Sequence, residues 1–252
     1  MTDRDIAATF AKGLSVLECF GTGQHSLTMA DIARLTGFDR ATTRRLCLTL
    51  EHSGYVYRDG KALRLSAKVL VLTGGFLTAQ YIGRAIQPTL NQFAEVIEGE
   101  IALAVLEGSR ALYVARSAVS AARLSLGLSV GSTLPLLPTA VGRMLLAQCE
   151  SAEMTRILKD CSAAPGSMAH KLDRPTVLAD IETTAKRGYA HVEDAFEMGA
   201  AGLAVPVPAI AQSHAVLSTT ASTLHLSRPG KLETTVDILR QAARHIRLAL
   251  DS

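Results

Sequence analysis

The chain has 252 residues, of which 48% are hydrophobic and 19% charged, and its formal net charge is +3. This composition is typical of a soluble globular protein, and the length favours two domains over one. No apolar run reaches the length of a membrane span, and the first residues lack the basic-then-apolar order of a signal peptide, so we expect a cytoplasmic protein that does not cross a membrane.

The positive charge is unevenly distributed along the chain. Residues 1–70 hold ten Lys and Arg against seven Asp and Glu, whereas the remainder holds sixteen of each. All the excess positive charge therefore lies in the N-terminal segment. This distribution is expected of a nucleic-acid-binding module joined to a neutral module.

Cysteine and histidine spacing gives no sign of a metal centre. The four cysteines form no C-x-x-C pair, and the seven histidines form no H-x-x-x-H pair. We expect the cysteines to be small buried hydrophobic residues in a reducing compartment, with a redox sensor or metal site as the alternative. We predict neither a metal site nor a cofactor. The cysteines are Cys19, Cys47, Cys149 and Cys161.

Three helices are predicted at the N-terminus. Apolar residues recur at helical spacing over residues 10–20, among them Phe10 and Leu14. Thr28 is a predicted N-cap with Asp31 three residues later, and that helix runs to about residue 35 and stops at Gly37. A further helix begins near residue 39, where an Asp side chain can accept backbone N–H bonds.

The last of these helices has two distinct faces. The inward face is predicted to hold Thr43, Leu46, Cys47 and Leu50, at spacings of three and four residues. The other face holds Arg40, Ala41, Arg44, Arg45 and Leu48. Residues 55–58 and 61–65 flank Asp59-Gly60, which predicts a two-residue β-hairpin. Helix, turn, helix and hairpin together form a winged helix-turn-helix.

The outward arginines suit a polyanion. In a helix-turn-helix the second helix enters the major groove, where Arg bonds guanine or grips phosphate. A Thr hydroxyl can reach phosphate, and cations beside the hairpin turn suit the flanking backbone or minor groove. A solvated arginine face on a helical bundle is the plainer alternative. The predicted DNA-binding residues are Arg40, Ala41, Thr42, Arg44, Arg45, Arg58 and Lys61.

The pattern from residue 66 onward predicts a linker followed by an α+β domain. Residues 66–96 are helical in pattern, interrupted at Gly74-Gly75, which suggests a hinge, and at Pro88. Beyond residue 99, β-like runs and helices predict a sheet of roughly six strands with helices around it, a sensor-type arrangement. We divide the chain into a DNA-binding domain (1–70), a helical linker (71–98) and a C-terminal domain (99–252).

Three separated blocks resemble the IclR family of bacterial transcriptional regulators. Residues 13–20 (GLSVLECF) with residues 29–55 resemble its DNA-binding domain. Residues 130–147 (VGSTLPLLPTAVGRMLLA), and then 187–190 (RGYA) with 199–207 (GAAGLAVPV), resemble its effector-binding domain. The sequence of residues 133–143 most resembles the PcaR/PobR-like branch of the family. Members of that branch sense aromatic acids and control aromatic catabolism.

The resemblance implies a homodimer, or a dimer of dimers, on a palindromic or repeated promoter site. It also implies a GAF-like C-terminal domain with one small-molecule pocket. The family often has Ser where this chain has Ala41, so one hydroxyl contact to DNA is missing and the family's half-site preference does not carry over.

The effector pocket is predicted from a helix start and from family position. Small residues at 138–143 begin a helix whose backbone N–H groups favour an anion, Gly142 would let a ligand approach closely, and Arg123 would neutralise an acid. The resemblance adds the loop after the Gly-Tyr strand and the next two strands. Ordinary packing and surface roles are the alternatives for each residue. The candidates are Arg123, Thr139, Ala140, Gly142, Glu193, Asp194, Gly202, Ser218 and Thr220.

No catalytic grouping emerges from the sequence. G-x-S-x-G, Walker and Ser/His/Asp patterns are absent, and adjacent Glu193 and Asp194 would point to opposite faces of a strand. We therefore predict a DNA-binding transcriptional regulator, not an enzyme, that responds to a small organic acid, aromatic in the narrower prediction, and controls a catabolic operon. The alternatives are a small-molecule enzyme with an N-terminal dimerisation module and a ligand-independent DNA-binding protein.

Overall fold

The computed structural model describes residues 6–22, 25–79, 82–119, 128–163 and 173–251. The chain forms two compact units, Met1–Leu77 and Thr78–Ser252. The division falls seven residues beyond the limit of 70 expected from the sequence. Each unit is described by itself below.

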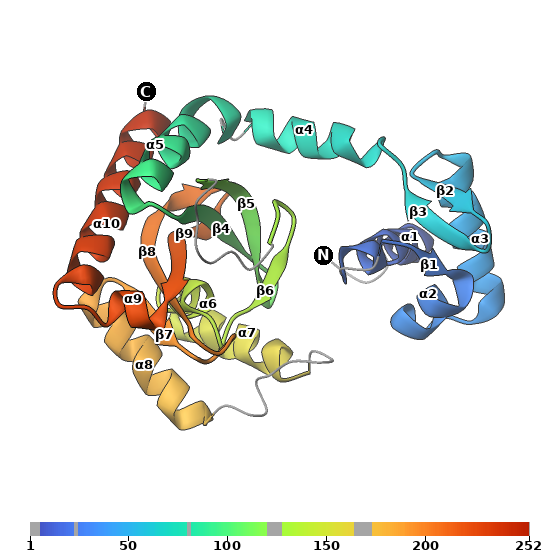
Figure 1. Ribbon diagram of the computed structural model, residues 1–252. Coiled ribbons are helices and arrows are strands. Elements are labelled where there is room, and N and C mark those ends of the chain that lie inside the picture. The colour runs from blue at the N-terminus through green and yellow to red at the C-terminus, as the bar shows by residue number, and fades with distance from the viewer. Residues whose placement is uncertain (1–5, 23–24, 80–81, 120–127, 164–172, 252) are drawn as a thin grey trace. The chain divides into compact units, whose positions relative to one another are not determined.

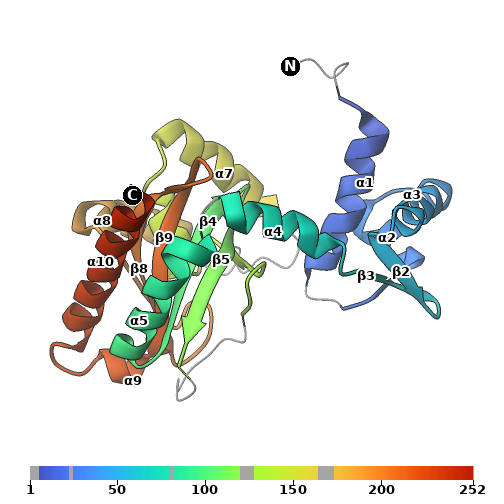
Figure 2. The ribbon, with the colours of Figure 1, turned by 90° about the horizontal axis from the view of Figure 1, so that it is seen from above.

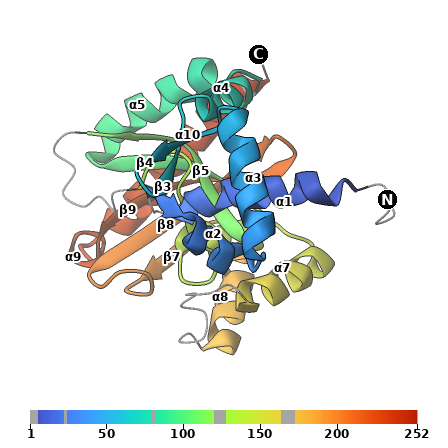
Figure 3. The same ribbon diagram turned by 90° about the vertical axis from the view of Figure 1, so that its right-hand side faces the viewer.

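The N-terminal unit combines helices with a small sheet (Figures 1 and 3). Its three strands are antiparallel in the order β1-β3-β2, which places the hairpin β2–β3 beside the short β1. This is a winged helix-turn-helix, as the sequence predicts. Its elements are α1 (Ala8–Glu18), the 3₁₀ turn η2 (Cys19–Thr22), β1 (Leu27–Thr28), α2 (Met29–Thr36), α3 (Arg40–His52), β2 (Val56–Asp59) and β3 (Ala62–Leu65).

The predicted helix caps are confirmed. The Thr28 hydroxyl accepts the Asp31 N–H at 3.2 Å, and the Asp31 carboxylate accepts the Thr28 N–H at 3.1 Å, which completes a capping box. Gly37 ends α2 in the left-handed conformation with φ 72°. Asp39 caps α3 by accepting the Thr42 N–H at 2.9 Å.

The core of this unit also follows the sequence, with two corrections. Thr43, Leu46, Cys47 and Leu50 are buried on α3, as the helical spacing predicts. Of the apolar residues at helical spacing in residues 10–20, Phe10 is 69% and Leu14 44% exposed, whereas Val16 on α1 and Phe20 in η2 are buried, together with Cys19. In the hairpin, Asp59 pairs with Ala62, so the two-residue turn is Gly60-Lys61, one position later than expected.

Two helices follow the wing. Gly74 and Gly75 lie inside α4 (Val69–Ala79), so the expected interruption at these glycines is wrong. The π-helical turn η3 (Ile82–Ile86) then leads into α5 (Gln87–Ile97), where Pro88 sits in the first turn. No single described helix is long and apolar enough to cross a membrane; only α4 taken together with Arg84–Ile97, bent by 56°, has the required length and composition.

The C-terminal unit is built on an antiparallel sheet of six described strands in the order β6-β5-β4-β9-β8-β7. The central β4, β8 and β9 consist largely of buried residues on both faces, which explains their continuous apolar sequence. The strands are β4 (Glu100–Glu107), β5 (Arg110–Ala118), β6 (Thr133–Pro135), β7 (Ala190–Glu193), β8 (Ala200–Ile210) and β9 (Ser213–Ser222).

Helices cover both faces of this sheet (Figures 1 and 2). α5 and α10 (Lys231–Leu250) pack together on one face, whereas α6 (Ala140–Leu146), α7 (Ser151–Ala163) and α8 (Arg174–Arg187) share a core with the other. The short α9 (Thr223–Leu226) follows β9. This layered α+β arrangement agrees with the GAF-like expectation.

Candidate nucleic-acid interface and ligand pocket

The outward face of α3 is cationic. Arg40, Arg44 and Arg45 are all exposed, and within the part of the chain that the structure describes, none of them forms an ion pair or a side-chain hydrogen bond. Arg40 and Arg44 are one helical turn apart and share a stripe on α3. Since the opposite face of the helix is buried, these guanidinium groups are held outward on a rigid element. Such a surface is suited to a duplex groove.

The start of α3 holds the Thr42 hydroxyl in place. Its Oγ1 donates to Asp39 Oδ2 at 2.7 Å, while the backbone N–H of Thr42 bonds Oδ1. These hydrogen bonds lower the pKa of Asp39, so the cap is ionised at neutral pH. A DNA phosphate only accepts hydrogen bonds, so a phosphate contact from the Thr42 hydroxyl would require its proton to leave Asp39. Ala41, beside it, is exposed.

The wing contributes cations of two kinds. Arg58 forms a two-pronged pair with Glu51, with Nη2 2.9 Å from Oε2 and Nε 3.3 Å from Oε1. This pair raises the pKa of Arg58 and fixes the guanidinium against the end of α3. Lys61 is exposed within the turn. Of the two predicted wing contacts, only Lys61 projects without an ionic partner among the described residues.

A pocket opens on the α6 side of the large sheet. Its walls come from β5, the first turn of α6, the loop after β7, and the strands β8 and β9. Apolar side chains supply most of the lining, as in small-molecule sites generally, and the polar side chains are hydroxyl groups and the Glu197 carboxylate. The lining residues are Tyr113, Leu134, Pro138, Thr139, Ala140, Val141, Val192, Phe196, Glu197, Ala200, Gly202, Leu203, Thr219 and Thr220.

Four of the residues expected at the pocket line it together. They are Thr139, Ala140, Gly202 and Thr220. Gly202 lies where a side chain would intrude, because an added Cβ would come within 3.2 Å of the Ala140 Cβ. The Thr139 hydroxyl, in contrast, is already committed: it accepts the Gly142 N–H at 3.0 Å and donates to the Pro135 carbonyl at 2.8 Å. It shapes the start of α6.

The other expected residues that the structure describes do not line the pocket. Gly142 is not open to a ligand, because an added Cβ would lie 2.1 Å from the Leu136 backbone; the glycine permits close packing of two backbone segments. Asp194, with φ 52°, accepts the Gly199 N–H at 2.6 Å and so closes its own loop. Glu193 is exposed, 3.1 Å from His191. Arg123 lies outside the described residues.

Ser218 does not line the pocket itself but contacts Tyr113, a lining residue that the sequence analysis did not predict. Tyr113 is 4% exposed, and a side-chain hydrogen bond joins it to Ser218. Burial raises the pKa of Tyr113 to about 12, so its phenol is neutral at physiological pH. Ser218 itself donates to the Ala102 carbonyl at 3.3 Å. Ser218 thus positions Tyr113.

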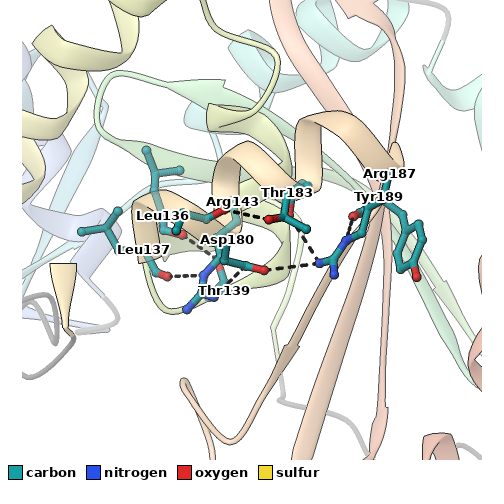
Figure 4. A network of polar contacts seen from close by, with 10 residues as sticks. Leu136, Leu137, Thr139, Arg143, Asp180, Thr183, Arg187 and Tyr189 are labelled. Atoms are coloured by element: carbon teal, nitrogen blue, oxygen red, sulfur yellow. Dashed lines mark hydrogen bonds and ion pairs between the residues drawn. The ribbon is translucent and has the colours of Figure 1, made fainter. Parts of the chain in front are cut away.

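An ionic network fixes the helix that carries the pocket wall (Figure 4). The Arg143 side chain, 11% exposed, donates from Nε to the Leu137 carbonyl at 2.9 Å and from Nη1 to Asp180 at 2.8 Å. Asp180 lies between Arg143 and Arg187, as Figure 4 shows, and is 3.6 Å from Arg187. This network ties the loop before α6 to α8. It orients the first turn of α6, which lines the pocket.

A winged helix-turn-helix with a free arginine face, followed by a unit containing a small-molecule pocket, defines a ligand-responsive DNA-binding protein. Two family profiles match the chain: the IclR helix-turn-helix domain over residues 9–60, and the bacterial transcriptional regulator IclR C-terminal domain over residues 75–248. The chain therefore belongs to the IclR family of transcriptional regulators. Both family names describe regulators, not enzymes.

Its relatives point to one branch of that family. The chain is 33% identical to the Pca regulon regulatory protein of Pseudomonas putida over 207 residues, covering 81% of this chain and 70% of the relative. It is 29% identical to the Pca operon regulatory protein of Acinetobacter baylyi over 96% of this chain and 89% of the relative.

A solved structure gives the same fold. The chain matches an IclR homologue from Microbacterium hydrocarbonoxydans, solved with 4-hydroxybenzoate, with a TM-score of 0.74 and 24% identity over 96% of this chain and 99% of the homologue. At this identity the match establishes the shared fold.

Proposed function

We propose that this protein regulates a catabolic operon by binding promoter DNA through α3 and the wing and a small aromatic acid through the pocket of the C-terminal unit. The observation that carries the DNA half is the arginine face of α3. Arg40, Arg44 and Arg45 project from a helix whose opposite side is buried, and no carboxylate within the described residues pairs with them. We propose that Thr42, Ala41 and Lys61 complete the contact surface, joined by Arg58 when it is released from Glu51.

The effector half is supported by the lining of the pocket. Val192 and Leu203 offer apolar surface to a ring, while Tyr113 and Thr220 offer hydroxyl groups. Ala140 and Val141, in the first turn of α6, also line the pocket, and N–H groups at this point of a helix have no partners within the helix. Relatives named as Pca regulators and a homologue solved with 4-hydroxybenzoate support an aromatic carboxylate as the ligand class.

The DNA half can be tested with single arginine variants. Arg44→Ala and Arg45→Ala are compared with Arg156→Ala, a control on α7 of the other unit. Fluorescence anisotropy with a fragment of the chain's own promoter should show a loss of roughly 1–3 kcal/mol for each α3 variant that removes a direct contact. The control should bind like the unaltered protein. Equal binding by all four proteins would refute the assignment.

The effector half requires a separate titration. Calorimetry with 4-hydroxybenzoate and with an aliphatic acid of similar size should show binding of the aromatic acid only. Thr220→Val should weaken that binding, because the valine leaves a ligand polar group without its partner. At a ligand concentration 100 times the dissociation constant, unfolding should become about 2.7 kcal/mol less favourable. If no aromatic acid raises the melting temperature, the effector half of the proposal is refuted, and the DNA-binding half is unaffected.

We further propose a homodimer, or a dimer of dimers, acting in the cytoplasm, with residues 71–98 as the linker that transmits the ligand signal. Support comes from an exposed apolar surface. No residue of α4 is buried, and Leu70, Val71 and Leu72 are each at least 60% exposed. A second copy of the chain would cover it. Leu72→Glu should therefore lower the mass measured by light scattering, whereas a monomeric unaltered protein would contradict the proposal.

A further inference from the structure

Three metal-binding side chains converge at the end of the large sheet, away from the pocket lining. Cys149 lies in the connection between α6 and α7, Glu153 in the first turn of α7, and His214 near the start of β9. Their ligand atoms all lie within 4.8 Å of one another. None of the three lines the pocket described above, and neither the DNA-binding nor the effector-binding role uses them.

The fold holds this cluster together by independent contacts. The Gln148 amide donates to the Ala215 carbonyl at 3.2 Å, which fastens the α6–α7 connection to β9 beside the cluster. Within the cluster, His214 Nε2 is 3.3 Å from Glu153 Oε2. The Cys149 thiol is 3.4 Å from the Leu145 carbonyl and also hydrogen-bonds the Glu153 carboxylate. The three side chains therefore come together from two segments, the start of α7 with the residues before it and the start of β9.

We propose that Cys149, Glu153 and His214 bind a zinc ion. Thiolate, imidazole and carboxylate are the three ligand types that zinc accepts, and three protein ligands with one open position are usual outside purely structural sites. In a tetrahedral site with bonds of about 2.0–2.3 Å, neighbouring ligand atoms lie roughly 3.3–3.7 Å apart. The separation of Glu153 and His214 already falls in this range.

Charge balance favours a divalent ion. A thiolate and a carboxylate together carry two negative charges, which a zinc ion neutralises while the imidazole binds in its neutral form. On binding, the Cys149 thiol releases its proton to solvent and the Sγ–Zn bond forms. The side chains of Glu153 and His214 are 36% and 33% exposed, so the fourth position is open to water.

The same surroundings argue against the alternative of a redox-sensing cysteine. The Cys149 side chain is only partly exposed, and its thiol hydrogen-bonds the Glu153 carboxylate. Redox-sensing cysteines are accessible and lie next to cationic groups, whereas Cys149 lies beside a carboxylate. The other three of the chain's four cysteines, all within the described residues, are buried.

The decisive experiment titrates the full-length, metal-stripped protein with Co²⁺ as a spectroscopic probe of the zinc site. We expect one equivalent to bind with a thiolate-to-cobalt charge-transfer band, and Zn²⁺ to displace it and raise the melting temperature. Cys149→Ser should abolish the band, and His214→Gln should weaken Zn²⁺ binding at least tenfold. Cys161→Ser is the matched control and should retain the band.

Folding of each variant is checked by circular dichroism without metal, so that a lost band is not confused with an unfolded chain. If a variant does not fold, X-ray absorption at the zinc edge of the unaltered protein decides, because the site predicts one sulfur ligand and one imidazole. The proposal is overturned by the absence of a charge-transfer band, by a spectrum without sulfur, or by equal Zn²⁺ binding in Cys149→Ser and unaltered protein. Each outcome is independent of DNA and effector binding.

Discussion

Gly142 packs its backbone directly against that of Leu136: a Cβ atom at position 142 would lie 2.1 Å from both the Cα and the carbonyl oxygen of Leu136. The obstacle is main chain, which cannot swing aside as a side chain would. Gly142→Ala should therefore destabilise the C-terminal unit by roughly 3 kcal/mol, at the upper end of overpacking costs. Urea denaturation followed by circular dichroism measures this loss. A stability within 0.5 kcal/mol of the unaltered protein, roughly the level of a neutral surface change, would contradict the packing described here.

Gly202→Ala is expected to act on the ligand more than on the fold. Its added methyl would lie 3.2 Å from the Ala140 Cβ, a contact that a shift of a few tenths of an ångström relieves. We expect a stability loss of about 1 kcal/mol but at least about a tenfold weaker binding of 4-hydroxybenzoate, equivalent to ~1.4 kcal/mol. Calorimetry at equal folded fractions separates the two effects. Unchanged affinity would place the ligand elsewhere.

Neutralising Glu51 should release Arg58 toward DNA. The two side chains form a two-pronged pair, and exposed pairs of this kind contribute only about 0–1 kcal/mol to stability. Glu51→Gln should therefore fold normally and bind DNA more tightly at low salt. The slope of log affinity against log salt should steepen by up to about 0.9 for one added phosphate contact.

Glu18→Gln is the control for this experiment, because it changes the net charge by the same amount at an exposed residue of α1. A steeper slope in both variants would indicate a general charge effect. A steeper slope in Glu51→Gln alone would identify Arg58 as the new contact.

Tyr113 should make the protein less stable at alkaline pH. Its phenol has a pKa of about 12 in the folded chain against 10.0 for an ordinary tyrosine, so between these values the folded state binds the extra proton. Stability attributable to this group is present below pH 10 and falls as pH rises toward 12, by roughly 3 kcal/mol at most. Tyr113→Phe should show a shallower decline in denaturant titrations over this window. Comparing the stability of the two proteins at pH 8 measures the effect of removing the hydroxyl on packing. Identical declines in stability between pH 10 and 12 would refute the raised pKa of Tyr113.

Local signals in the sequence were sufficient for most of the DNA-binding unit. The Asp39 cap, the Gly37 terminus and the two faces of α3 depend on residues within two helical turns of each other. The incorrect predictions concern features that neighbouring residues in the sequence do not determine. Helical spacing in α1 does not reveal that Phe10 faces solvent, and the hairpin turn is set by the pairing of Asp59 with Ala62.

The pocket was less predictable because strand register assembles it. Tyr113 on β5 meets Ser218 on β9 only because β4 lies between these strands and pairs with both. Likewise Cys149 and His214 are brought together by the β8–β9 hairpin and the α6–α7 connection, far apart in sequence. The sequence predicts a close approach to the backbone at Gly142, but only the packing shows that Leu136 is the neighbour.

The two-faced α3 separates what the protein reads from what keeps it folded. Thr43, Leu46, Cys47 and Leu50 anchor the helix, while Arg40, Arg44 and Arg45 make no contribution to that anchoring within the described residues. Exchanges at the outward positions leave the buried side intact. If these arginines read the operator, as we propose, single-residue changes at the outward positions can alter the target sequence without passing through unstable intermediates.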